Sequence, residues 1–210
     1  MNWPDLAALS GTLEGADAAL GRWWLPAAMA GLFAEAFPLV GLVSPGLTLL
    51  IFAGFKSASL PLVQAIAAFG GCLAAIVAGD WLAFLAGRAG AGRWPRLGAR
   101  LRGMSGESRD WSSATFGTLL FYQFPPYARM FAPALLGLQG YPAARWSGLV
   151  LAASTGFVTA TFGAGYAAGL AGGGPVRAIA GMGNVVALLS LTFLVSLGGI
   201  GLRRFRQVRR

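Results

Sequence analysis

The chain has 210 residues, of which 56% are hydrophobic and only 11% are charged, and it contains no histidine. Soluble domains carry about 25% charged residues, so this chain lacks the charge needed to cover the surface of a soluble fold. Its 32 glycines follow no period of three, which excludes collagen, and the apolar content excludes a disordered chain. These properties predict an all-α integral membrane protein.

The charge pattern and the residue types also indicate which classes of function to expect. The net charge is +9, and the arginines gather beside apolar stretches, in 88–109 and 203–210. This pattern is typical of the positive-inside rule rather than of a nucleic-acid partner. With one cysteine, Cys72, and no histidine, we expect no metal and no cofactor. The sequence contains no phosphate-binding loop and no catalytic triad, so we expect that the protein is not an enzyme.

The first segment, 1–23, mixes acidic residues and Arg22 with leucines at roughly helical spacing. It is predicted to be an amphipathic segment at the membrane surface, although a frayed polar tail is the alternative. A single membrane domain, 24–202, is expected to follow. Its apolar stretches are each at least as long as the ~20 residues that cross a bilayer, and they comprise 24–55, 60–87, 113–138, 146–170 and 182–202.

Basic segments set the expected topology. Five arginines in the tail 203–210 place the C-terminus in the cytoplasm, and the basic linker 88–112 is expected there too. Stretch 113–138 then has both ends on the cytoplasmic side, so it is predicted to be re-entrant, and Pro125 and Pro126 break a helix in its middle. The remaining stretches 60–87, 146–170 and 182–202 are predicted to be transmembrane helices.

Stretch 24–55 is too long for one upright helix and is broken at Pro45 and Gly46, so it is predicted to be a second re-entrant hairpin, entering from the outside. Hairpins from opposite faces, each followed by a transmembrane helix, indicate an inverted repeat. Irregular backbone at membrane depth is tolerated where it lines protein or a wet cavity, so the hairpins favour a transport pathway. Two ordinary spans in place of each hairpin are the alternative.

Ionisable residues in the apolar stretches are candidates for function because isolated charge in the bilayer is costly. Glu35 lies in the first hairpin and Arg129 in the second. If the two meet, each lowers the desolvation cost of the other. Arg129 suits a phosphate or carboxylate headgroup, and Glu35 is a candidate proton carrier or gate. The alternative is an inert ion pair, or a Glu35 that stays protonated.

Asp80 stands eight residues before Arg88 on one helix face and is a candidate to pair with Arg88 or Arg129. Arg88 is interpreted mainly as an anchor that reaches the interface. An interfacial aromatic belt is expected from the tryptophans at segment ends, which are Trp23, Trp24, Trp94, Trp111 and Trp146.

Over residues 30–170 the chain resembles the DedA family of bacterial inner-membrane proteins, within the SNARE-associated or VTT-domain superfamily. The resemblance rests on the order of Phe33-Ala-Glu35, Ser44-Pro-Gly46, Ala53-Gly54, Gly79-Asp80, Gly87-Arg88, Pro126-Tyr-Ala-Arg129, Pro133 and Gly137. It implies two facing re-entrant hairpins and movement of lipid between leaflets, with a link to recycling of undecaprenyl phosphate and to the proton-motive force.

By position, Glu35 resembles the glutamate of the family's first hairpin, and Arg129 the second of two hairpin arginines. Leu47 stands where the family usually has an acid, and Gln123 where it usually has the other arginine. We hypothesise that the two were lost as a pair, so that Leu47→Asp with Gln123→Arg is better tolerated than either single change. The candidate substrate-binding residues are Arg129, Gln123 and Tyr127, and the candidate proton-coupling residues are Glu35 and Asp80.

The sequence therefore predicts a transporter that moves a phosphate-headed lipid between leaflets, with lipids and protons as its partners. Three alternatives stay open: an uncoupled scramblase, an envelope-integrity or assembly factor, and a proton-coupled transporter of small ions or drugs.

Overall fold

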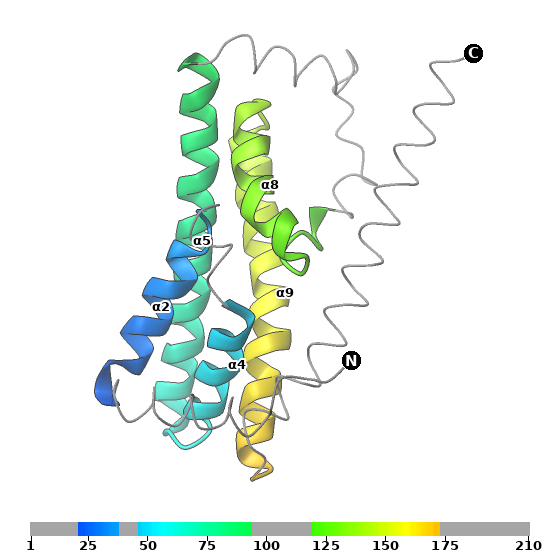
Figure 1. The fold of residues 1–210 in the computed structure, drawn as a ribbon. Helices are drawn as coiled ribbons and strands as arrows, with labels where there is room; N and C mark the ends of the chain where they lie inside the picture. The colour runs from blue at the N-terminus through cyan, green and yellow to red at the C-terminus, as the bar shows by residue number, and fades with distance from the viewer. Residues whose placement is uncertain (1–20, 38–45, 94–118, 173–210) are drawn as a thin grey trace, which may run out of the picture. The chain divides into compact units, whose positions relative to one another are not determined.

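A computed structural model describes residues 21–37, 46–93 and 119–172 (Figure 1). No strand occurs in these residues, which confirms the all-α prediction for this part of the chain. The elements are η1 (Gly21–Trp23), α2 (Trp24–Ala34), α4 (Gly46–Ser57), α5 (Leu62–Arg93), α8 (Pro126–Leu138) and α9 (Ala143–Leu170). Helices α5 and α9 are long and apolar enough to cross a membrane, whereas α2, α4 and α8 are shorter.

Helix α5 runs further than the sequence analysis predicted. It continues from Leu62 to Arg93, so residues 88–93, the first part of the predicted basic linker, are helical. The physical reason is that no proline interrupts this stretch. Pro95 is the first proline after residue 61, and helices usually end at or before the residue that precedes a proline. Helix α9 likewise begins at Ala143, three residues before the predicted 146.

In both stretches predicted as hairpins, the described residues contain helix ends. In the first, α2 ends at Ala34 and α4 begins at Gly46. In the second, a turn leads into α8, with Pro125 in extended conformation at the N-cap and Pro126 as the first helical residue. Proline suits that first position because its missing N–H has no intrahelical partner there in any case. Pro45, the segment 1–20, most of the linker, the predicted span 182–202 and the tail 203–210 lie outside the described residues.

The chain forms two compact units, and each takes part of both long helices. The first comprises residues 1–79 and 154–183, and the second comprises 80–153 and 184–210. The described helices of the first unit are α2, α4, the beginning of α5 and the end of α9. Those of the second unit are the end of α5, α8 and the beginning of α9.

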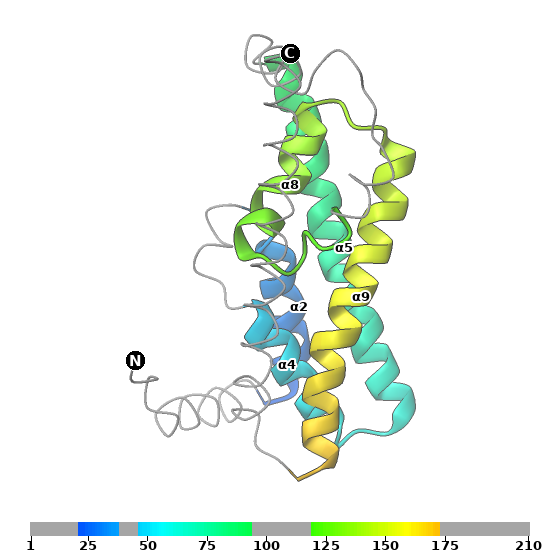
Figure 2. The same cartoon turned by 90° about the vertical axis from the view of Figure 1, so that its right-hand side faces the viewer.

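In the first unit, α4 lies directly against the end of α9 (Figure 1, Figure 2). A Cβ added to Gly54 would collide with the carbonyl oxygen of Phe162, and one added to Gly165 would collide with that of Ile51. Only glycine allows backbones to approach this closely. A Cβ on Gly169 would lie 2.9 Å from the carbonyl oxygen of Phe55. The contacts advance by four residues along both helices, so the two helices run parallel.

The second unit repeats this packing between α8 and the end of α5, which also run in the same direction (Figure 1). A Cβ on Gly87 would collide with the carbonyl oxygen of Ala134, and one on Gly137 with that of Phe84. In both units each contact glycine follows, by three residues, the residue whose carbonyl meets the other glycine. The two units therefore share one helix-packing pattern, in which a short helix pairs with a long one.

Candidate functional site

Three charged side chains are buried among the described residues, and they are Glu35, Asp80 and Arg129. The sequence analysis had singled out all three. Charge withdrawn from water is retained when polar groups or opposite charges surround it, so the partners of these side chains indicate what they do.

Asp80 lies at the centre of a buried polar cluster in the second unit. Its Oδ2 atom accepts hydrogen bonds from the Tyr122 hydroxyl at 2.7 Å and from Gln123 Nε2 at 2.6 Å. Gln123 Nε2 also donates to the Tyr122 hydroxyl oxygen at 2.9 Å. The three side chains are at most 1% exposed. Two donors that converge on one oxygen favour a carboxylate anion at this position.

Arg129 completes this group, which we call the Asp80 cluster (Asp80, Tyr122, Gln123 and Arg129). It is 4% exposed and stabilises the charge of Asp80 electrostatically. Helix register explains the proximity. The contact glycines Gly87 and Gly137 hold α5 and α8 together, and Asp80 and Arg129 precede them by seven and eight residues, about two turns on each helix. Parallel helices thus bring both residues to one level.

Aromatic rings pack beside Tyr122 of the Asp80 cluster. Trp146 stacks on Phe84 with ring centroids 5.2 Å apart and an interplanar angle of 9°, and its ring lies 5.8 Å from that of Tyr122. Trp81 meets Phe84 edge to face at 5.6 Å. Trp146 has no exposed surface, so its predicted place in an interfacial belt is wrong. It lies in the first turn of α9, and packing on Phe84 removes it from the lipid-facing surface. Trp23, at 59% exposed, remains compatible with a belt.

Trp146 has a further property that its sequence position did not reveal. Its indole nitrogen is buried and has no hydrogen-bond partner among the residues that the structure describes. Buried indole N–H groups usually find an acceptor.

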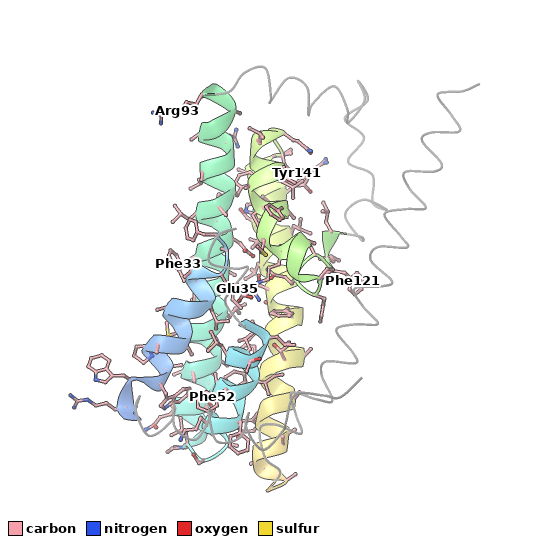
Figure 3. All side chains as sticks on the ribbon, in the orientation of Figure 1. Phe33, Glu35, Phe52, Arg93, Phe121 and Tyr141 are labelled. Atoms are coloured by element: carbon pink, nitrogen blue, oxygen red, sulfur yellow. The ribbon has the colours of Figure 1, made fainter. Side chains whose placement is uncertain are left out.

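Glu35 belongs to the first unit, where it lies immediately after α2 and faces the start of α4 (Figure 3). It is 8% exposed. Its carboxyl group fills the space that a Cβ on Gly46 would occupy. The N-terminus of a helix carries partial positive charge and favours an anion. Gly46, predicted only as a helix breaker, therefore also makes room for this carboxyl group.

The other predicted site residues have separate outcomes. Arg88 is exposed, in keeping with an anchor. Leu47 lies half-buried in the first turn of α4. The side chain of Tyr127 lies outside the described residues, and an approach of Glu35 to Arg129 stays a prediction. The sequence analysis missed Tyr122. The feature that could have indicated it is a tyrosine next to Gln123 in an apolar stretch that prolines interrupt. A tyrosine hydroxyl buried in such a stretch needs a hydrogen-bond partner.

The Asp80 cluster combines one buried base and one buried acid with two neutral side chains that donate hydrogen bonds to the acid. A planar guanidinium offers several donors in a geometry that fits phosphate or carboxylate, and Asp80 is the anion already present. No group of three or more metal-binding side chains occurs within 21–37, 46–93 and 119–172. Comparison with protein-family models, curated proteins and solved structures finds no match to this chain.

Proposed function

We propose that this protein is a membrane transporter that moves a phosphate-headed lipid, of the undecaprenyl phosphate type, between the leaflets of a bacterial inner membrane. The observation that carries the proposal is the buried Asp80 cluster, in which Arg129 lies on a short helix that begins at a proline break. The helices α5 and α9, long enough to cross a membrane, support the setting. The resemblance of the sequence motifs to the DedA family supports the substrate class.

In this proposal Arg129 binds the headgroup and Asp80 is its resident counter-ion. The phosphate oxygens bind the guanidinium, and Asp80 takes up a proton so that no additional charge stays buried. Tyr122 and Gln123 hold the carboxyl group in place through hydrogen bonds that converge on Oδ2. Gln123 supplies a neutral donor where the family usually has an arginine, and Tyr127 is a further candidate for headgroup contact.

Glu35 is proposed as the gate of the first hairpin. Its carboxyl group lies against Gly46 at the start of α4, where an anion is stabilised and a neutral acid is stabilised less. Protonation of Glu35 would therefore loosen the junction between α2 and α4. This gives proton uptake a direct effect on a helix that borders a break in the chain.

The proposed topology has re-entrant segments at 24–55 and 113–138 and a cytoplasmic C-terminus. The glycine packing shared by the two units supports an internal repeat, because in each unit the helix after a break pairs with a long helix in the same way. Such repeats are common in transporters, whose substrate sites lie at broken helices.

A reconstitution assay tests the proposal. Vesicles with fluorescent polyprenyl phosphate in both leaflets are treated with a membrane-impermeant quencher, so that only lipid reaching the outer leaflet loses its signal. The wild-type protein should accelerate the loss above protein-free vesicles. Arg129→Gln should lower the rate about tenfold or more, since hydrogen bonds to charged groups contribute about 1.5–3 kcal/mol. The rate of Arg129→Lys should lie between those of the wild type and Arg129→Gln, because lysine keeps the charge but lacks the planar guanidinium with its paired donors.

Arg145→Gln is the matched control. Arg145 is exposed, and its replacement removes the same charge outside the Asp80 cluster. It should behave as wild type. The proposal is wrong if wild-type vesicles are no faster than empty ones, or if Arg129→Gln transports normally. An imposed pH gradient then separates a coupled transporter, whose net movement follows the gradient, from a scramblase, whose movement ignores it.

A second candidate function is proton-coupled transport of a small cation. The balance of buried charge favours it, because the described part of the chain buries two acids, Glu35 and Asp80, against the single base Arg129. Ethidium uptake into vesicles with an imposed pH gradient is the measurement. Uptake that requires Asp80, in vesicles that do not move polyprenyl phosphate, would select this candidate over the first.

A further inference from the structure

Trp146 is the residue of the second unit whose chemistry the proposed function leaves unused. It has no exposed surface, and its indole nitrogen lacks a hydrogen-bond partner among the described residues. A buried donor without an acceptor costs free energy, so such a group calls for an explanation. Packing alone does not require the nitrogen, because a phenyl or naphthyl ring would stack on Phe84 equally well.

The location of the indole indicates what could satisfy it. Its ring lies against that of Tyr122, with centroids 5.8 Å apart, and the hydroxyl of Tyr122 is bonded to Asp80. The indole is thus separated from the carboxyl group by one side chain. Arg129 acts electrostatically on both Tyr122 and Asp80, and Trp146 packs against the same Tyr122.

We propose that Trp146 is a further ligand-binding residue, whose indole N–H donates to an oxygen of the anionic headgroup held by Arg129. A phosphate group offers several acceptor oxygens, so one oxygen can bind the guanidinium while another accepts from the indole. This inference rests on the proposed function, and it assigns the ligand a second anchor that recognises an acceptor oxygen without adding charge. An alcohol headgroup lacks the negative charge that makes such bonds strong.

The decisive variant removes the N–H and keeps the shape. Trp146 is replaced with 3-benzothienylalanine, in which sulfur takes the place of the indole N–H. Trp146→Phe is the simpler companion variant. Trp81→Phe is the matched control, since Trp81 also packs on Phe84, at 5.6 Å, but is only half-buried. Each full-length protein in detergent micelles is titrated with polyprenyl phosphate, and with polyprenol as the probe that lacks the phosphate, while its thermal unfolding is followed.

The benzothienyl variant should unfold, without lipid, at the wild-type temperature or above, because no hydrogen bond is lost in that state. The variant should need about ten times more polyprenyl phosphate than the wild type for the same rise in unfolding temperature. Its response to polyprenol should stay unchanged. Trp81→Phe should bind the phosphate lipid as wild type does.

Two results would overturn the inference. One is a lower unfolding temperature of the lipid-free benzothienyl variant, which would show that the N–H is satisfied within the protein. The other is binding of polyprenyl phosphate equal to that of wild type. Both differ from failure of the proposed function, in which the wild-type protein itself does not respond to polyprenyl phosphate.

Discussion

The electrostatic effect of Arg129 on Asp80 predicts a measurable coupling free energy between the two side chains. Asp80→Asn keeps the size of the side chain and an acceptor oxygen but removes the charge. Its two hydrogen bonds, at 2.7 Å from Tyr122 and 2.6 Å from Gln123, change from charge-assisted to neutral. Charge-assisted bonds contribute about 1.5–3 kcal/mol and neutral bonds about 0.5–1.5 kcal/mol. The two bonds together therefore lose about 2–3 kcal/mol.

Arg129 adds to this cost because it loses the carboxylate whose charge it stabilises. Removal of one partner from a buried pair typically costs about 3–5 kcal/mol, so we expect about 3 kcal/mol for Asp80→Asn and a similar loss for Arg129→Gln. With both changes present neither charge is buried alone. The double variant should therefore be more stable than the sum of the single effects predicts, by about 1–3 kcal/mol.

Thermal unfolding of the purified protein in micelles measures this cycle, at about 2–4 °C per kcal/mol for a chain of this size. Arg93→Gln combined with Asp80→Asn is the control, because Arg93 is exposed and lies thirteen residues along α5, about 20 Å away (Figure 3). That control cycle should be additive. Effects of Asp80→Asn and Arg129→Gln that add within about 0.5 kcal/mol would refute the argument that the two side chains form one electrostatic unit.

Three further predictions follow from single contacts, and thermal unfolding measures each. Gly165→Ala should destabilise the protein by about 2 kcal/mol or more, because the new Cβ collides with backbone. Gly163→Ala, whose Cβ meets open space, should be neutral or stabilising by up to about 1 kcal/mol. Equal effects of the two changes would contradict the packing. Gly46→Ala should destabilise strongly, and much less when Glu35→Ala removes the carboxyl group that it strikes; an unchanged cost in that background would disprove the steric explanation. Tyr122→Phe should cost about 1.5–3 kcal/mol through loss of a charge-assisted bond, and an unaltered midpoint would argue against an anionic acceptor.

The sequence predicted most of the helices because apolar length and proline position decide them. Two adjacent prolines favour a helix start, and the structure begins α8 at Pro126, although α8 also accommodates Pro133 in its interior. The predicted span ends before Arg88, whereas α5 continues as a helix to Arg93. Arginine is a good helix former, so charge marks where a helix meets water and does not end it.

Side-chain partners were harder to predict because they depend on the register between helices. Asp80 was expected to pair with Arg88 or Arg129, and the sequence offered no basis for choosing. The register is fixed by glycine contacts, such as those of Gly87 and Gly137. Trp146 was misplaced for the same reason, since its position at a segment end does not reveal that Phe84 covers it.

The glycine register also relates the two halves of the candidate machinery. In the second unit Arg129 precedes the contact glycine Gly137 by eight residues, and in the first unit Gly46 precedes Gly54 by the same eight. The equivalent position thus carries a guanidinium in one unit and, in the other, a glycine whose vacant side is filled by the carboxyl group of Glu35. The packing pattern thus places Arg129 in one unit and, in the other, the glycine beside which the carboxyl group of Glu35 lies. A change in the charge of Arg129 or of Glu35 therefore acts near the start of the short helix of its unit, eight residues before the contact glycine of that helix.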